Sequence, residues 1–327
     1  MYDYKKRYNR LLLIDTSNII HRCLCVPELF NLNNGTNVTG GVFGALKVFL
    51  SELKLNTNYF PVALFDGGLA PRRLKVYKDY KGNASRDPLP VLSEEEAKTD
   101  FLTQYRYTRT VLLDLLPKLG IPSIRIREWE ADDLIYICSK LSNECRILSE
   151  DRDYVQLVSP TCSVRRPKSN ELITISNFTE IMGYKDPEEF LKAKIILGDS
   201  SDQIPSCAKG VGPGTVLNLI NLINETNGNY TRDEKELKKL CEDKEIKYRK
   251  AFINFNREEY IRNLQLIDLR LVDIDVKDYI IDSLVAQIES VQKDTVFNIV
   301  SILNNLKIQH LDYTTLIQLI DQTKVNK

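Results

Sequence analysis

The sequence predicts an α/β fold with a mostly parallel central sheet. Short apolar segments of the strand type alternate with amphipathic helical segments, as they do in repeated βαβ units. Three of the strand-like segments have an aspartate at or just beyond their C-terminal end, namely Asp15, Asp66 and Asp151. Parallel strands bring their carboxyl ends to one edge of a sheet, where open α/β sheets carry their functional sites. These aspartates are therefore expected at a common edge.

The first half of the chain supplies most of the expected sheet. Four segments are short, apolar and β-like, and they cover residues 10–15, 60–66, 121–126 and 146–149. Apolar residues at helical spacing predict the intervening helices over residues 42–53, 111–119 and 134–141. This alternation of strands and helices is the reason for expecting the strands to be parallel.

The second half is expected to be mainly helical. Segments 161–166 and 171–175 flank a Pro-Lys-Ser-Asn turn, which predicts a β-hairpin. Helices are predicted over residues 154–158, 190–197, 216–223 and 260–267, with more helix from Val276 onward. The charged and polar segment 227–250 is expected to be partly mobile.

The composition is that of a globular protein with no membrane-spanning segment. The 327-residue chain is 43% hydrophobic and 28% charged, with 45 basic and 45 acidic residues. Zero net charge does not exclude a nucleic-acid partner, because the basic and acidic residues are segregated along the chain. No apolar run approaches membrane-spanning length, and no secretory signal is expected at the N-terminus. Seven scattered cysteines and two histidines argue against structural zinc and favour reduced thiols in the cytoplasm.

Acidic residues gather in two short clusters, Glu128–Asp133 and Asp151–Asp153. Carboxylates packed together without cations would repel one another, and some would have to protonate. Hard divalent cations remove that repulsion, and carboxylate oxygen is the ligand that Mg²⁺ and Mn²⁺ prefer. The structural alternative is a helix N-terminus with acids favoured by the helix dipole, beside a solvated loop.

Over the whole chain, eight acids stand at strand ends or helix starts. They are Asp15, Asp66, Glu130, Asp132, Asp151, Asp153, Asp199 and Asp202, with Asp133 as a ninth candidate. This number exceeds a general acid–base pair and fits a site for two divalent cations roughly 3.5–4 Å apart. Such sites catalyse in-line displacement at phosphorus. With the basic stretch and the glycine-rich turn described next, the acids predict phosphodiester hydrolysis on a nucleic acid.

A basic and aromatic stretch follows the second predicted strand. Its cations are Arg72, Arg73, Lys75, Lys78, Lys81 and Arg86, and Tyr77 and Tyr80 are interleaved with them. Tyrosines among lysines suit a surface that stacks bases and contacts phosphates. Pro88 and Pro90 interrupt the stretch, and Ser93 begins a predicted helix with a capping-box pattern. Residues 72–109 are thus expected to project from the sheet as an insertion, the alternative being a solvated pair of charged helices.

A glycine-rich turn precedes the predicted helix 216–223. It contains Gly210, Gly212 and Gly214, followed by Thr215. The backbone N–H groups of such a turn, together with the dipole of the next helix, can bind a phosphate. It is neither a Walker loop nor a dinucleotide fingerprint, because no Gly-Lys-[Ser/Thr] follows and no strand precedes it. An ordinary connection between helices is the alternative.

Taken together, these motifs resemble the 5′-nuclease family of flap endonucleases and 5′–3′ exonucleases. The matching stretches, in family order, are LLLIDTSN, TGGVFGAL, VALFDGG with RRLKVYKDYKGNASR, WEADDLIY, ILSEDRDYVQL, LGDSSDQIP and GVGPGT. They cover roughly residues 10–220, and NLQLIDL at 263–269 resembles the last helix before the family's C-terminal segment. The resemblance is to stand-alone bacteriophage members and to the 5′-nuclease domain of bacterial DNA polymerase I.

The resemblance implies a PIN-like, Rossmann-like core with a helical arch insertion and a helix–hairpin–helix (H3TH) motif. The expected division is a metal-dependent nuclease core at 1–190 that carries the arch at about 72–109, a duplex-binding region at 191–275, and C-terminal helices at 276–327 that pack back on the core.

The resemblance also implies which acids bind which cation. Those expected around the first cation, nearest the scissile phosphate, are Asp15, Asp66, Glu130 and Asp132. Those expected around the second are Asp151, Asp153 and Asp199, with Asp202 in its outer shell.

Three residues of the basic stretch have implied roles in the same way. Lys81 matches the lysine at the base of the arch that contacts the scissile phosphate, and Arg86 lies where a second arch cation is expected. Tyr80 is expected to stack on the base beside the cut.

Residues 210–215 match the family's hairpin that binds the uncut duplex strand, often around a bound monovalent cation such as K⁺.

The sequence departs from the family pattern near this hairpin. Ser206-Cys207-Ala208 replaces Gly-Val-Pro, and Gly214 stands where a lysine is usual. The loss of a phosphate-facing lysine should weaken the grip on duplex, with Lys209 as a candidate substitute.

The implied activity is structure-selective hydrolysis of DNA, or of RNA primers, by two Mg²⁺ or Mn²⁺ ions in replication or repair. Expected substrates carry a 5′ flap or a 5′ end, RNA–DNA hybrids included, and the products carry 5′-phosphate and 3′-hydroxyl ends. The chain is expected to be a monomer without membrane contact, in the bacterial cytoplasm or, if phage-encoded, that of the host, with replication proteins as candidate partners. The alternatives are a non-catalytic DNA-structure-binding protein and a PIN-type RNA-cleaving nuclease, although the latter are shorter and lack the arch and hairpin.

Overall fold

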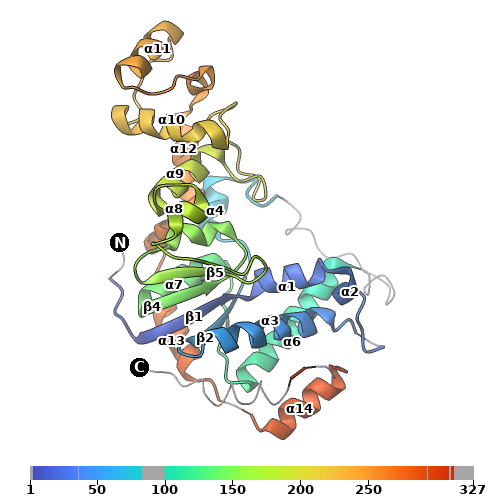
Figure 1. Cartoon of the computed structure of the whole chain (residues 1–327). Helices are drawn as coiled ribbons and strands as arrows, with labels where there is room; N and C mark the ends of the chain where they lie inside the picture. The colour runs from blue at the N-terminus through green and yellow to red at the C-terminus, as the bar shows by residue number, and fades with distance from the viewer. Residues whose placement is uncertain (1–2, 36, 83–99, 293, 309–310, 313–327) are drawn as a thin grey trace. The chain divides into compact units, whose positions relative to one another are not determined.

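The computed structural model describes residues 3–35, 37–82, 100–292, 294–308 and 311–312. The chain divides into two compact units (Figure 1). The sheet unit comprises Met1–Leu69, Leu89–Thr174 and Val272–Lys327, and the helical unit comprises Ala70–Pro88 and Ile175–Leu271. Within the described ranges, no helix has the length and apolar character needed to cross a membrane.

The sheet unit is built on a six-stranded sheet with the order β3-β2-β1-β4-β5-β6. Its strands are β1 Tyr8–Asp15, β2 Phe60–Phe65, β3 Ser123–Arg125, β4 Ser142–Leu148, β5 Cys162–Arg166 and β6 Glu171–Ile173. The first five strands are mutually parallel, and β6 is antiparallel to β5. The predicted mostly parallel sheet and the β5–β6 hairpin are confirmed.

Helices cover this sheet and bury its apolar residues. They are α1 Thr16–Leu24, α2 Pro27–Phe30, α3 Gly40–Leu55, α6 Phe101–Lys118, α7 Ala131–Leu141, the 3₁₀ helix η1 Arg152–Leu157, α13 Asp278–Glu289 and α14 Val296–Asn305. Leu12 and Ile14 of β1 pack in one core with α1, α3, α6 and α14 (Figure 1). Leu11 and Leu13 are equally buried and point to the opposite face, because side chains alternate along a strand.

The helical unit has a second apolar core of its own. Its helices are α4 Pro71–Val76, α8 Phe178–Met182, α9 Pro187–Leu197, α10 Pro213–Thr226, α11 Glu234–Asp243, η2 Lys250–Asn254 and α12 Arg257–Ile267. The 3₁₀ helix η3, Leu269–Ile274, is the link by which the chain returns to the sheet unit.

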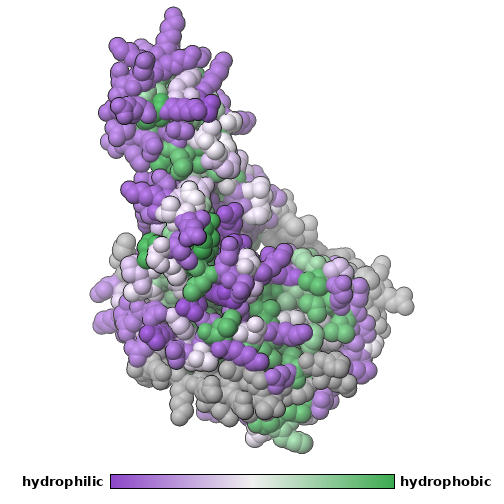
Figure 2. Space-filling view, in the orientation of Figure 1, coloured by the Kyte–Doolittle hydropathy of each residue, from purple (hydrophilic) through white to green (hydrophobic). Residues whose placement is uncertain are grey.

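Several predicted element bounds change in the structure. The strand expected over 121–126 shortens to β3, and the one expected over 146–149 begins earlier, at Ser142. The charged segment 227–250 contains a helix, α11, which begins at an Asp233 cap and buries Leu237 and Cys241 in the second core. Hydrophilic side chains cover the rest of α11 (Figure 2), which is why composition alone concealed the helix. The division at residues 190 and 275 stays a prediction, as does the helix expected from Ser93, which lies outside the described residues.

A buried ion pair joins α3 to β5. The Glu52 carboxylate accepts hydrogen bonds from the Arg165 guanidinium at 3.1 and 3.3 Å. The side chains are only 4% and 11% exposed, respectively, so removing one partner leaves the other charge buried without compensation.

We expect Glu52→Ala to lower the free energy of unfolding by about 3 kcal/mol, because an isolated buried guanidinium is strongly unfavourable. Urea denaturation followed by circular dichroism measures this. The matched control is Asp114→Ala, which removes the surface ion pair with Lys118 at 2.5 Å and should change stability by less than about 1 kcal/mol. If the two substitutions lowered the free energy of unfolding equally, the Glu52–Arg165 pair would contribute no more to stability than a surface ion pair.

Candidate active site

The predicted acids of the sheet unit lie at one edge of the sheet. Asp15 is the last residue of β1, and Asp66 directly follows β2. Glu130 caps the N-terminus of α7, and Asp132 lies in the first turn of that helix. Asp151 caps η1 shortly after β4, with Asp153 in the first turn. Since β1, β2 and β4 are parallel neighbours, all three strands deliver carboxylates to the same side.

The Asp15 carboxylate is buried and fully hydrogen-bonded. It is 5% exposed. Its Oδ1 accepts the backbone N–H of Asn18 at 3.0 Å. Its Oδ2 accepts two hydroxyl donors, Ser149 Oγ and Tyr154 Oη, each at 3.0 Å. These three donors hold the carboxylate in one orientation at the end of β1.

Negative charge accumulates around this carboxylate. Burial and then the charge of Asp66, with a further contribution from Asp151, raise the pKa of Asp15 to about 7 despite the hydrogen bonds from Asn18 and Ser149. Burial also raises the pKa of Tyr154 well above its ordinary value, and the charges of Asp15 and Asp132 add to that shift. The aspartates from four different segments therefore act on one another electrostatically, as the sequence predicted.

Ser149 and Ser17 connect the carboxylate-bearing segments. Ser149 Oγ, which donates to Asp15, accepts the backbone N–H of Asp151 at 3.0 Å. Ser17 Oγ accepts the backbone N–H of Asp66 at 2.9 Å. Each hydroxyl thus fixes the position of one acid relative to another strand end.

The acids of α7 differ in exposure. Glu130 and Asp133 are buried, whereas Asp132 is half-buried and accepts the N–H of Asp133 at 2.7 Å. The backbone N–H of Ala131 donates to Asp66 Oδ1 at 2.8 Å, which ties the start of α7 to the end of β2. The start of this helix is therefore part of the acidic edge and not a separate solvated loop.

The donor set suits hard divalent cations. Carboxylate oxygens are the ligands that Mg²⁺ and Mn²⁺ prefer, and bound cations would offset the charges of Asp66 and Asp151, which add to the effect of burial on the pKa of Asp15. In the described part of the chain, no three His, Cys, Asp or Glu side chains converge closely enough to hold a metal ion as they stand. The chemistry of these residues nevertheless fits such a cation.

Two predicted acids belong to the helical unit and have a different environment. Asp199 follows α9 and forms an ion pair with Lys194 at 2.9 Å. Burial favours the protonated form of Asp199, but the Lys194 ammonium and hydrogen bonds from Ser201 hold the pKa below its ordinary value. The Asp202 carboxylate accepts the Tyr80 hydroxyl at 3.3 Å, and its backbone oxygen accepts the N–H of Lys81 at 3.0 Å.

Lys81 has an uncommon backbone conformation. Its φ of 54° lies in the left-handed region that side-chain-bearing residues rarely adopt. The hydrogen bond to Asp202 supports this conformation, and the ammonium lies 5.3 Å from the centre of the Tyr80 ring. Local strain of this kind is often kept where a side chain must be aimed.

Two residues expected to contact nucleic acid are buried instead. Tyr80 is only 1% exposed, so its ring is not available to stack on a base, and that expectation is wrong. Arg73 is equally buried, its guanidinium lies over the Tyr80 ring, and its Nε donates to the Leu266 carbonyl at 3.3 Å. Both residues pack within the helical unit, where Arg73 connects α4 to α12. Of the other predicted cations, Lys75 and Lys78 are exposed, Arg72 is half-buried, and Arg86 lies outside the described residues.

The glycine-rich turn forms the N-terminus of α10. Gly210 has a φ of 87°, and the Thr215 hydroxyl accepts the N–H of Gly212 at 3.1 Å. A Cβ added at Gly212 or Gly214 would meet nothing within 4 Å, so no internal contact requires glycine there. The absent side chains leave the backbone open to a group from outside, and Lys209 beside them is exposed.

Sequence reasoning missed the hydroxyl groups around the acids. Ser149, Tyr154 and Ser17 stand one or two residues from a predicted metal ligand, but nothing in their spacing marked them. Tyr105 of α6 is a further case: burial and the charge of Asp66 raise the pKa of Tyr105 to about 12, and it hydrogen-bonds Ser17. No sequence signal connects position 105 to this edge, because only the packing of α6 against α1 brings it there.

Comparison with known proteins now identifies the chain. Residues 10–183 match the family model described as the 5′–3′ exonuclease, N-terminal resolvase-like domain. The chain belongs to this family. It is 29% identical over 284 residues to a 5′–3′ exonuclease of Buchnera aphidicola subsp. Acyrthosiphon pisum, a match that covers 84% of this chain and 92% of the relative. The resemblance inferred from the motifs is confirmed.

Solved structures show the same fold. The T5 5′-exonuclease with bound divalent zinc ions has a TM-score of 0.62 at 22% identity, covering 86% of this chain and 99% of that one. The bacteriophage T5 D15 flap endonuclease, solved as a pseudo-enzyme–product complex with DNA and metal ions, has a TM-score of 0.59 at 20% identity, covering 96% and 100%. The predicted PIN-like α/β class is therefore correct for this chain.

We expect Tyr154→Phe to weaken divalent-cation binding roughly tenfold or more, because groups that orient a metal-binding carboxylate typically contribute that much. The substitution removes one donor to Asp15 Oδ2 and keeps the ring. Calorimetric titration with Mn²⁺ measures the affinity directly.

The control for this substitution is Tyr8→Phe. Tyr8 is also a buried tyrosine of the sheet unit, and its hydroxyl has no hydrogen-bond partner among the described residues. Mn²⁺ affinity should be unchanged in this variant. A loss of equal size in both variants would mean that the Tyr154 effect is a general loss of stability.

Proposed function

We propose that this protein is a structure-selective 5′-nuclease that hydrolyses phosphodiester bonds of DNA with the help of divalent cations. The observation that carries the proposal is the gathering of carboxylates from separate strand ends at one edge of the sheet, where burial and then the charge of Asp66 raise the pKa of Asp15 to about 7. Such an arrangement is costly to a protein unless cations bind there. The family relationship and the fold support the nucleic-acid substrate.

In this proposal, different acids bind different cations. Asp15, Asp66, Glu130 and Asp132 would hold the cation nearest the scissile phosphate, and Asp151 and Asp153 a second one. Bound Mg²⁺ or Mn²⁺ supplies an activated water near neutral pH and stabilises charge on the departing 3′ oxygen. The role of Asp133, Asp199 and Asp202 as further ligands stays a prediction.

The chain's own groups orient these acids and favour their ionised form. Hydroxyls of Ser149 and Tyr154 hold Asp15 so that its carboxylate keeps one orientation. Hydrogen bonds to the ionised form oppose the effect of burial, because they favour the charged state. The products expected of this chemistry carry 5′-phosphate and 3′-hydroxyl ends.

The helical unit is proposed to bind the duplex. The open backbone at Gly212 and Gly214 can approach a phosphate closely, and the exposed Lys209 adds charge beside it. A bound K⁺ at this turn, action on RNA primers and on RNA–DNA hybrids, monomeric state, replication partners and a cytoplasmic location belong to the same proposal.

The alternatives differ in measurable ways. A PIN-type RNA nuclease would cut single-stranded RNA and ignore 5′ flaps. A non-catalytic binding protein would bind flaps and cut nothing. End-labelled 5′-flap, nicked and single-stranded DNA, with an RNA strand for comparison, separate all three in one assay.

We expect cleavage of the 5′-flap substrate to require added Mg²⁺ or Mn²⁺ and to stop in excess EDTA. Asp153→Asn should abolish cutting while flap binding persists, because it removes a metal ligand and no phosphate contact. Gel assays of cleavage and fluorescence anisotropy of binding measure the two effects. Full activity in EDTA would contradict the two-cation proposal, and an equal loss of binding would make Asp153 structural.

Lys81 is proposed to act on the reacting phosphate and Lys78 on the strand outside it. Lys81→Ala should lower the single-turnover rate roughly a hundredfold with little change in flap affinity, because it removes an interaction made in the transition state. The exposed Lys78→Ala should instead weaken binding and reduce the salt slope by about one. Identical behaviour of the two variants would make Lys81 an ordinary backbone contact.

A further inference from the structure

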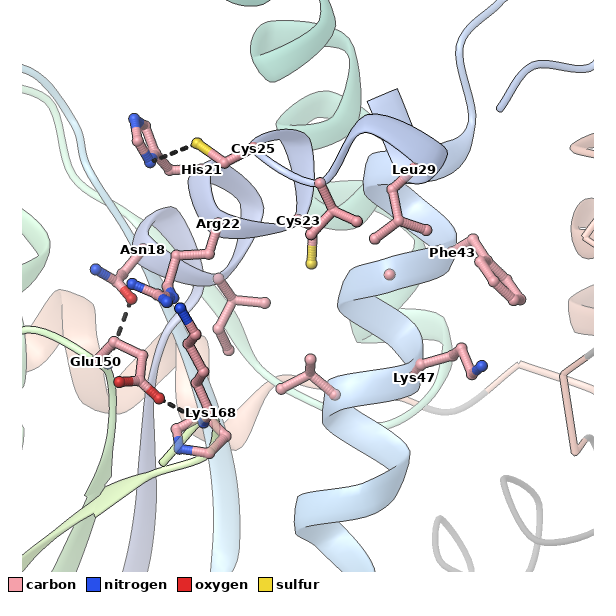
Figure 3. Close-up of a pocket in the computed structure, with 15 residues that line it drawn as sticks. Asn18, His21, Arg22, Cys23, Cys25, Leu29, Phe43, Lys47, Glu150 and Lys168 are labelled. Carbon is pink, nitrogen blue, oxygen red and sulfur yellow. Dashed lines mark hydrogen bonds between the residues drawn. The ribbon is translucent and has the colours of Figure 1, made fainter. Parts of the chain in front are cut away.

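A cavity of about 640 Å³ lies in the sheet unit between α1, α3 and the turns that follow β4 and β5 (Figure 3). This volume is in the range of sites that hold small organic groups. All of its lining residues belong to one compact unit. The acids proposed to bind metal do not line it, so it is distinct from the acidic edge.

The floor of the cavity is apolar. It is formed by Ile19, Cys23, Leu29, Phe43 and Val48, which are buried or partly buried against the main core. Figure 2 shows apolar side chains gathered over α1 and α3 on this face of the unit. Among these five floor side chains, the Cys23 thiol is the strongest hydrogen-bonding group. The floor can therefore pack against an apolar group without selecting its polar substituents.

The rim of the cavity is basic. Arg22 and Lys168 lie on one side of it, and Lys47 lies on the other with Phe43 (Figure 3). Among the described residues, none of these three side chains forms an ion pair with a carboxylate. The one acid at the rim, Glu150, is engaged elsewhere: its carboxylate accepts the backbone N–H of Lys168 and pairs with Arg166 at 3.4 Å.

The cavity adjoins the acidic edge of the sheet through Asn18 and Glu150. Asn18 lines it, and the backbone N–H of the same residue donates to Asp15 at 3.0 Å. Glu150 lines it as well and immediately precedes Asp151, with its own N–H donating to the Asn18 side chain at 3.3 Å. A strand held at the carboxylates therefore has the cavity within reach of its neighbouring nucleotides.

We propose that this cavity binds one unpaired nucleotide of the substrate strand. The base lies on the apolar floor, and the phosphates beside it pair with Arg22, Lys47 and Lys168. The inference rests on the proposed nuclease function and adds a subsite to it. A nucleotide fits better than an acidic peptide, because the cavity shares α1 and the β4–η1 turn with the acids that would act on the strand. The apolar floor predicts binding without preference for one base.

The base is tested with abasic substitutions. Asp153→Asn protein is mixed with 5′-flap substrates that lack the base at one unpaired position next to the junction in turn. At one position, removing the base should weaken binding roughly tenfold, as base contacts with apolar side chains typically contribute. Val48→Phe, which fills the cavity from α3, should abolish this penalty. An equal penalty in Asp153→Asn protein with and without Val48→Phe, or none at any position, overturns the proposal.

The rim is tested separately, so that a folding defect in Val48→Phe leaves the proposal open to refutation. Lys47→Ala and Lys168→Ala should each reduce the salt slope of flap binding by about one. The matched control is Lys140→Ala on α7, outside the cavity, which should leave the slope unchanged. Unchanged slopes in the rim variants overturn the nucleotide assignment and leave an acidic peptide as the alternative occupant.

These outcomes are separable from failure of the proposed function. If wild-type protein neither binds nor cuts the flap in Mg²⁺, the nuclease proposal fails. If it cuts normally while Val48→Phe and both lysine variants behave as wild type, only the nucleotide subsite fails.

Discussion

The buried carboxylate of Asp15 is the group on which the active-site architecture depends. Burial raises its pKa, and the charges of Asp66 and Asp151 push the pKa further in the same direction. Three donors, from Asn18, Ser149 and Tyr154, oppose both effects and hold its two oxygens in place. The parallel strands β1, β2 and β4 are what bring these charges together.

The acids of the helical unit show the opposite balance. Lys194 lies 2.9 Å from Asp199 and keeps that carboxylate ionised in spite of burial. In the helical unit, a neighbouring ammonium therefore compensates the charge of Asp199, whose role as a metal ligand stays a prediction. In the sheet unit, the carboxylates of Asp15, Asp66 and Asp151 instead act on one another at the sheet edge. This contrast is why the sheet unit carries the proposed chemistry.

Two cations lie near this acidic edge, since Arg125 Nε donates to the backbone oxygen of Asp66 at 3.0 Å and the charges of Arg109 and Asp66 act on each other. In the sheet unit, Arg22 and Lys168 line a neighbouring cavity, and Glu150 between them is satisfied by Arg166 and by backbone. Arg73, which the sequence placed among exposed cations, is buried beneath Tyr80 and stabilises α4 instead. Zero net charge thus includes buried and paired charges as well as the acids at the sheet edge and the cations at the cavity rim.

The mostly parallel sheet and the acids at its edge follow from the sequence alone, because strand and helix periodicities are local and Asp15, Asp66 and Asp151 each lie at or just after the end of an apolar strand. The order of the strands within the sheet was not predicted. Tyr80 and Arg73 could not be placed in this way: their types suit a DNA surface, and only the packing of α4 against α12 shows that they are buried. Ser149, Tyr154 and Tyr105 likewise acquire their roles from distant partners. Sequence determined which groups reach the sheet edge, and tertiary packing decided their exposure and hydrogen bonds, since both depend on contacts between residues far apart in the chain.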